Sequence, residues 1–128
     1  MQQRPVYLDL TKISLPMSAF ISITHRLSGM YLFFITIPLL LFMIRQSISS
    51  KSNYEKLLID ISSISPFSLF VFFSVAVLWY HVLTGVRHLI MDFFHIGESL
   101  KASHYSSIFT VSFWFITSLS FFGYFYII

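Results

Sequence analysis

The chain has 128 residues, of which 56% are hydrophobic and only 10% are charged. Soluble domains usually carry about a quarter charged residues, so this composition excludes an ordinary soluble enzyme and indicates a membrane protein. The net charge of +3 then bears on membrane orientation and not on nucleic acid. The chain has no cysteine, which excludes disulfides, thiolate metal sites and iron–sulfur ligation by this chain.

A long apolar stretch follows a polar to amphipathic lead-in of residues 1–21. Residues 27–44 contain no charged side chain, and with the preceding turn they span about 30 Å at roughly 1.5 Å per residue. This predicts a first membrane helix over about residues 22–45. Pro38 lies inside it, and because membrane helices tolerate proline, we expect a kink there.

The connection after this helix is polar, and a capping pattern marks the start of the next one. Residues 45–65 carry charged side chains and a group of serines, which we interpret as a loop. Ser65–Pro66 combines an N-cap residue with a proline in the first turn. The second helix is predicted over about 66–93, with Gly97 as a stop. The third is predicted over about 105–127.

We therefore predict a single all-α transmembrane domain over residues 1–128, with three crossings and its ends on opposite sides. One side would carry Arg4, Lys12, Arg26, Arg87 and Lys101, and the other Arg45, Lys51 and Lys56. Cytoplasmic loops are enriched in Lys and Arg, so five against three places the N-terminus in the cytoplasm.

The end of the second helix carries ionisable residues within or just beyond an apolar run. Such residues are costly in a membrane and are functional candidates. At roughly 100° per residue, one helix face holds His81, Gly85, His88 and Asp92, whereas Arg87 points to a different side. This face is typical of a cofactor wall or of a proton route.

The topology places the start of the first helix level with the end of the second. The residues expected at that surface are Ser22, His25, Arg26, Arg87, His88 and Asp92. His81 lies deeper, roughly 9 Å below Arg87 and roughly 16 Å below Asp92.

A deep imidazole beneath cationic groups suits an upright b-type haem. Gly85, one turn from His81, would let a flat ring approach the backbone. His25 is expected at the wrong depth to be a second axial ligand, so that ligand would come from another chain. The alternative is that His81 hydrogen-bonds between helices or faces water.

Ser22 and Arg26 lie one turn apart and share a helix face with Gly29. A hydroxyl and a guanidinium beside an apolar cavity can hold a carbonyl oxygen and stabilise negative charge on it, as a quinone head group requires. The alternative is that His25 and Arg26 only anchor the helix by reaching to the membrane surface.

Three segments of the chain resemble the cytochrome b membrane-anchor subunit of succinate dehydrogenase, the larger of two anchors in the bacterial complex. They are Arg-Pro-Val-Tyr-Leu-Asp-Leu at 4–10, Ser-Ile-Thr-His-Arg-Leu-Ser-Gly at 22–29, and His-Val-Leu-Thr-Gly-Val-Arg-His at 81–88 followed by Asp92. The resemblance covers nearly the whole chain, including the lead-in, the helices and the loop lengths.

The resemblance implies a multi-pass subunit of the bacterial cell inner membrane, rather than the mitochondrial one. With a second anchor subunit it would hold a flavoprotein and an iron–sulfur subunit to the cytoplasmic face. It would share haem b with the second anchor, and ubiquinone would accept the electrons of succinate oxidation. The chain alone would hold no complete catalytic site.

The resemblance also implies roles for individual residues. His81 matches the axial ligand of the haem iron. Ser22 and Arg26 match residues of the ubiquinone site, and His25 and Arg26 match contacts to the haem propionates. Asp92 matches a carboxylate at the edge of the quinone region, and further support comes from Arg87, His88 and Gly85.

Three alternatives stay open at this point. The first is that the chain is a haem-free structural anchor. The second is that it anchors a quinol–fumarate reductase, because the sequence does not determine the direction in which electrons flow. The third is a small proton or solute channel that uses the face formed by His81, His88 and Asp92.

Overall fold

The computed structural model describes residues 16–97 and 99–127, and these are almost entirely helical, with no strand. The elements are α1 (Met17–Tyr31), the π-helical turn η2 (Leu32–Thr36), α2 (Ile37–Ser49), α3 (Lys51–Ser62), α4 (Pro66–Phe94) and α5 (Leu100–Tyr126). Three continuous helical spans are long and apolar enough to cross a membrane, namely 17–49, 66–94 and 100–126. The prediction of an all-α membrane protein with three crossings is confirmed.

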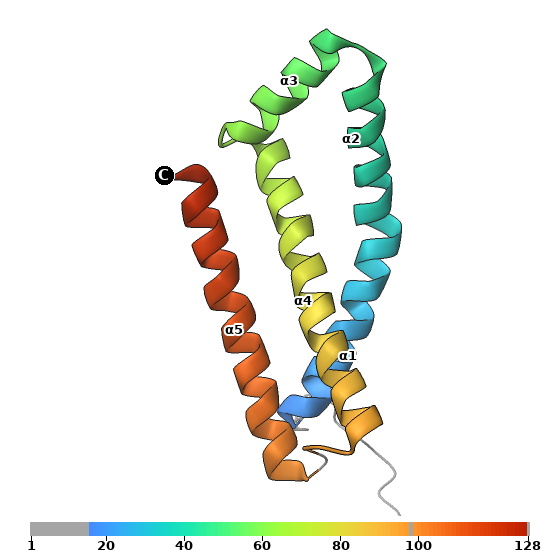
Figure 1. Ribbon diagram of the computed structural model, residues 1–128, viewed down its shortest axis with the longest axis vertical. Helices are drawn as coiled ribbons and strands as arrows, with labels where there is room; N and C mark the ends of the chain where they lie inside the picture. Colours follow the sequence, from blue (N-terminus) through green and yellow to red (C-terminus); the bar gives the residue numbers. More distant parts are fainter. Residues whose placement is uncertain (1–15, 98, 128) are drawn as a thin grey trace, which may run out of the picture.

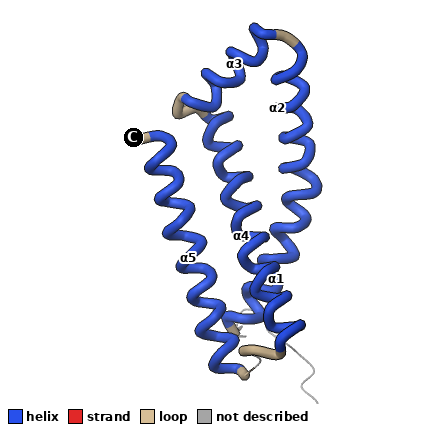
Figure 2. Tube along the Cα trace, viewed as in Figure 1, coloured by secondary structure: helices blue, strands red, loops and turns tan. Residues whose placement is uncertain are grey.

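The three spans stand side by side, with α4 between α5 and α2, while α1 crosses α4 and reaches α5 at one end (Figure 1). The start of α1 and the α4–α5 connection lie at one end of the molecule, and α3 lies at the other (Figure 1). The loops are short and confined to the two ends (Figure 2). α1 packs against both α4 and α5, so the interior is most enclosed at this end.

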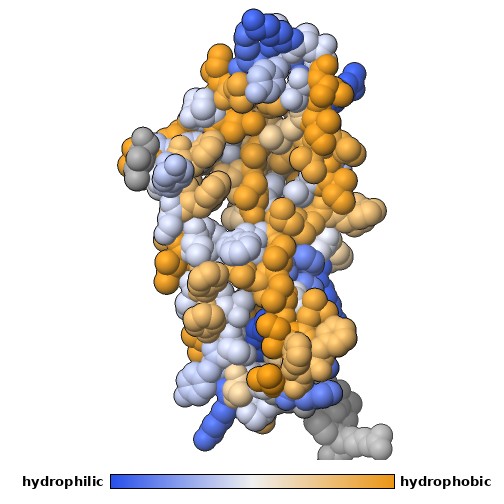
Figure 3. Space-filling model, in the orientation of Figure 1, coloured by the Kyte–Doolittle hydropathy of each residue, from blue (hydrophilic) through white to orange (hydrophobic). Residues whose placement is uncertain are grey.

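The packing is inverted relative to a soluble protein, with apolar side chains outside and small polar ones inside. Apolar residues cover the middle of the molecule and hydrophilic residues gather at its ends (Figure 3). Within the described residues, Ile21 is the one buried hydrophobic residue. The other buried residues there are Ser28, Ser68, Ser74, Thr84, Arg87, Ser103, Ser107 and Thr110. Small and hydroxylated residues at the helix contacts are the pattern expected where lipid removes the hydrophobic drive for helix association.

The irregularity expected at Pro38 is a π-helical turn. Proline lacks an N–H and its ring clashes with the carbonyl four residues back, here that of Phe34. The five residues of η2 come directly before Ile37 and Pro38 and widen the helix where that clash would fall. The chain changes direction between α1 and α2 (Figure 1).

The interpretation of residues 45–65 as a loop is wrong, because most of this segment is the helix α3. Ser50 caps it, and the Ser50 hydroxyl oxygen accepts a hydrogen bond from the Asn53 N–H at 3.1 Å. Serine favours both loops and N-caps, so the serine group alone did not distinguish the two.

The cap predicted at Ser65–Pro66 is confirmed. The Ser65 hydroxyl accepts from the Ser68 N–H at 3.1 Å, and α4 begins at Pro66. The other two membrane helices begin earlier than expected, at Met17 after Pro16 and at Leu100 after Ser99. The α4 helix ends at Phe94, with His95 in the left-handed conformation and Gly97 also at positive φ.

Candidate functional site

Three histidines gather where α1 crosses α4. The rings of His25 and His81 stack with their centroids 4.2 Å apart and their planes 9° apart. The ring of His88 lies 5.5 Å from that of His25 at an angle of 58°. Among the described residues, no group of three or more histidine and carboxylate side chains has the geometry of a metal site.

The placement of His25 corrects the expectation that it lies at a different depth from His81. The expectation counted residues along each helix separately, and it did not include the angle at which α1 crosses α4. Glycines make the crossing close. A Cβ on Gly85 would lie 3.3 Å from Nε2 of His25, and one on Gly29 would lie 3.2 Å from Cε1 of His81. Each histidine thus packs on a glycine of the opposite helix.

The ring of His81 is also held by a hydrogen bond. Ser28 is buried, and its Oγ lies 2.8 Å from Nδ1 of His81. The same Ser28 hydroxyl donates to the backbone carbonyl of His25 at 2.7 Å. Ser28 belongs to the segment 22–29 singled out above, but sequence reasoning gave it no role. Its spacing of three residues after His25, on a helix, was the available signal.

Two further side-chain contacts fasten α1 to α4. The Thr24 hydroxyl of α1 shares a hydrogen bond with the Tyr80 hydroxyl of α4. Tyr31 and Ser74 are joined at 3.0 Å, nearer the middle of the membrane span. Sequence reasoning assigned no function to these residues. Together with Ser28 they bring α1 and α4 into a fixed register around the histidines.

Arg87 points away from the histidines, as the helical spacing predicted, and it does not join the surface group in which the topology placed it. Arg87 is 8% exposed, and its guanidinium is directed at α5. Nε donates to Ser106 Oγ at 3.0 Å, and Nη2 donates to both the carbonyl and the Oγ of Ser103 at 3.0 Å. Neutral oxygens of α5 satisfy this buried guanidinium, so Arg87 acts as a clamp that holds α4 against α5.

The remaining predicted site residues lie on the outer surface of the same end. Ser22 is half-buried, and Arg26 and Asp92 are exposed. In the part of the chain that the structure describes, no hydrogen bond or ion pair joins these three side chains to one another. Their assignment to a quinone site therefore stays a prediction.

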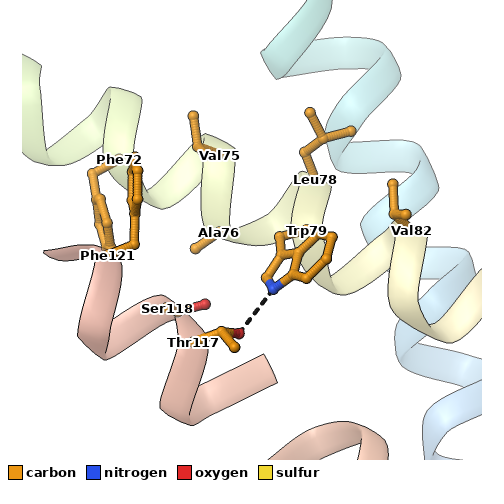
Figure 4. A pocket seen from close by; sticks show the side chains of 9 residues that line it. All are labelled: Phe72, Val75, Ala76, Leu78, Trp79, Val82, Thr117, Ser118 and Phe121. Carbon is orange, nitrogen blue, oxygen red and sulfur yellow. Dashed lines mark hydrogen bonds between the residues drawn. The ribbon is translucent and has the colours of Figure 1, made fainter. Parts of the chain in front are cut away.

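An apolar cleft of about 420 Å³ lies on the α4–α5 side of the molecule (Figure 4). Phe72 stacks on Phe121 at 6.1 Å, and the indole of Trp79 donates to Thr117 Oγ1 at 2.9 Å. Apart from hydroxyl groups the lining is apolar, and it contains no titratable side chain. The cleft suits lipid or an apolar helix and carries no chemistry of its own.

The imidazole nitrogens at the crossing would fit a haem. The hydrogen bond of His81 uses Nδ1, and Nε2 has no partner among the described residues. Nε2 of His25 is buried, again without a described partner. Buried polar atoms are usually satisfied, and an exception in a native structure points to a missing group.

Three helices long and apolar enough to cross a membrane, two of which carry a histidine cluster at their crossing, define a multi-pass integral membrane protein. The chain matches the model of the succinate dehydrogenase/fumarate reductase transmembrane subunit family over residues 1–121. It is also 33% identical over 113 residues to the succinate dehydrogenase cytochrome b556 subunit of Coxiella burnetii, covering 87% of this chain and 89% of that relative. The chain belongs to the succinate dehydrogenase/fumarate reductase transmembrane subunit family, as the resemblance predicted.

Proposed function

We propose that this chain is the cytochrome b anchor subunit of a succinate dehydrogenase and that His81 is an axial ligand of a haem b. The observation that carries this proposal is the state of the His81 ring. Its Nδ1 is hydrogen-bonded to Ser28, whereas Nε2 has no partner in the described chain. Histidines that ligate metals usually hold their second nitrogen in this way. The name of the Coxiella burnetii relative supports a b-type haem.

The surroundings of His81 support the same role. Gly29 lets the ring of His81 lie directly against α1, and the stacked ring of His25 brings a second imidazole to the same place. We assign His25, through its unpartnered Nε2, and the exposed guanidinium of Arg26 to the haem propionates. A bound haem supplies one-electron redox chemistry. His25 stacks face to face on His81 and so lies on the same side as that ligand, and we assign the second axial ligand to a second anchor subunit.

We further propose that Ser22 and Arg26 bind the head group of ubiquinone. Arg26 is exposed and forms no ion pair with a described residue, so its guanidinium is available to a ligand. A guanidinium and a hydroxyl one turn apart can hold a quinone carbonyl oxygen and stabilise the negative charge that reduction places on it. Asp92 and His88 lie near the end of α4 and would line the edge of this site.

The proposed assembly follows from what the chain lacks. It has no cysteine, so iron–sulfur clusters must be held by another subunit. We propose a complex with a second membrane anchor, an iron–sulfur subunit and a flavoprotein subunit on the cytoplasmic face of the bacterial inner membrane. The start of α1 would lie toward that face.

The proposal is tested by isolating the chain in mild detergent through an affinity tag and identifying what accompanies it. We expect flavoprotein and iron–sulfur subunits, a b-type band in the reduced-minus-oxidised spectrum, and succinate-driven reduction of ubiquinone. The same subunits without a b-type band would identify a haem-free anchor. Faster quinol-driven fumarate reduction than succinate oxidation would identify a fumarate reductase. A proton leak from the isolated chain in liposomes would support a channel.

A further inference from the structure

We propose that Ser28 is a positioning residue for the haem ligand, which fixes the tautomer of His81 and increases the basicity of its Nε2. The inference rests on the proposed ligation of haem by His81. Ser28 itself would touch neither haem nor quinone. It would act through the hydrogen bond to Nδ1, on the side of the imidazole away from the iron.

The direction of that hydrogen bond follows from the proton of the Ser28 hydroxyl. A serine hydroxyl has one proton to donate and two lone pairs to accept with. Ser28 Oγ lies 2.7 Å from the carbonyl oxygen of His25, which can only accept, so the proton is used there. The contact at 2.8 Å to His81 must then be an Nδ1–H donating to the hydroxyl oxygen.

This direction determines which nitrogen of His81 can bind a metal. A neutral imidazole carries its proton on one nitrogen and a lone pair on the other. With the proton on Nδ1, the lone pair is on Nε2, the nitrogen that has no described protein partner. The tautomer required of a ligand is therefore set by the protein before any metal binds.

The hydrogen bond lies in a poorly solvated place. Ser28 is 6% exposed, and the neighbouring Gly29 allows the ring of His81 to lie against α1. The stacked ring of His25 covers one face of the imidazole. A hydrogen bond away from water is electrostatically stronger than one in solvent, so Ser28 can polarise the ring effectively.

Polarisation of the ligand has a measurable consequence. An acceptor on Nδ1–H moves electron density toward Nε2, and a more basic ligand favours the more oxidised, more positive iron. Loss of the acceptor should therefore raise the reduction potential of the haem. A residue that only packed helices together would have no reason to shift the potential in this direction.

The test is a redox titration of the haem, followed by its absorption band, in the purified complex carrying Ser28→Ala, Ser28→Thr or Ser74→Ala. Ser74 is the matched control, because it is also buried, donates to the Phe70 carbonyl at 3.0 Å, and joins α4 to Tyr31 of α1. We expect a shift to higher potential in Ser28→Ala only, with Ser28→Thr near the unaltered protein. An unchanged potential in Ser28→Ala at unchanged haem content would overturn the inference.

Two further outcomes are decided by the same set of variants. If Ser28→Ala assembles without haem, recovery of haem in Ser28→Thr supports the inference and continued loss contradicts it. A His81→Ala complex separates this inference from the function on which it rests. If that complex keeps an unaltered haem, then the ligand assignment fails. If it loses the haem but Ser28→Ala has the potential of the unaltered protein, only the role of Ser28 fails.

Discussion

The imidazole rings of His25 and His81 stack nearly parallel, with centroids 4.2 Å apart, although they come from two different membrane spans. Each ring also packs on a glycine of the opposite helix, His25 on Gly85 and His81 on Gly29. This reciprocal arrangement lets two flat groups lie between α1 and α4 where larger residues would hold the helices apart. The crossing is thereby shaped around planar rings, and the function proposed here depends on that shape.

The first prediction concerns Gly29→Ala. The new Cβ would lie 3.2 Å from Cε1 of His81, so the ring must shift by a few tenths of an ångström. Alanine stabilises a helix relative to glycine by roughly 0.5–1 kcal/mol, whereas overpacking costs about 1–3 kcal/mol. The net effect of Gly29→Ala on this crossing is therefore destabilising. We expect lower haem content or a displaced haem band. Gly123→Ala is the control, since nothing lies within 4 Å of its new Cβ, and it should leave the spectrum unchanged.

The second prediction concerns the clamp between α4 and α5. Arg87→Ala removes three hydrogen bonds to Ser103 and Ser106, and we expect a loss of roughly 1–3 kcal/mol of stability. Arg87→Lys should recover only part of it, because an ammonium lacks the planar donor fork. The measurement is the midpoint of thermal inactivation of the complex in detergent. Arg45→Ala, at an exposed position of α2, should leave that midpoint in place; equal effects at both positions would contradict the clamp.

The third prediction concerns the quinone site. Arg26→Leu or Ser22→Ala should reduce succinate–ubiquinone reductase activity while succinate oxidation by a soluble acceptor is retained. Loss of a charge-assisted hydrogen bond costs about 1.5–3 kcal/mol, which corresponds to a loss of roughly 10- to 150-fold for Arg26→Leu. Lys101→Gln removes a cation at the same end of the molecule and should change neither activity. A parallel fall of both activities in Arg26→Leu would show that the assignment is wrong.

The fourth prediction concerns membrane orientation. The chain has no cysteine, so single cysteines report on position without further changes. Ser52 of α3 and Lys101 of α5 are exposed at opposite ends of the molecule. With the N-terminus in the cytoplasm, an impermeant thiol reagent added to cells with a permeabilised outer membrane should label Ser52→Cys, and should label Lys101→Cys only after lysis. The reverse labelling pattern would invert the topology.

Local sequence features were sufficient to predict the spans and some of their ends. The start of α4 was predicted because Ser65 and Pro66 act on their own first turn. The position of α3 was missed, because a short amphipathic helix is fixed by a single cap at Ser50 within a polar segment. The response to Pro38 was predicted only as a kink, since a π-helical turn depends on how the whole span accommodates the clash.

The candidate site was predicted only in part, for a geometrical reason. Helical spacing correctly separated Arg87 from the face of His81, because both belong to one helix. It did not bring His25 against His81, because their distance depends on the angle at which two helices cross. Ser28 was missed for the same reason: its spacing of three residues after His25 indicates only the contact within α1, whereas its partner His81 lies on the other helix.

The central claim is that His81 ligates a haem b, and the reduced-minus-oxidised spectrum of the purified complex tests it most directly. His81→Ala is compared with His104→Ala, which replaces an exposed histidine of α5 outside the cluster. We predict a b-type band of normal position and intensity in the unaltered complex and in His104→Ala, and its loss or displacement in His81→Ala. A band of unchanged position and intensity in an assembled His81→Ala complex would contradict the account.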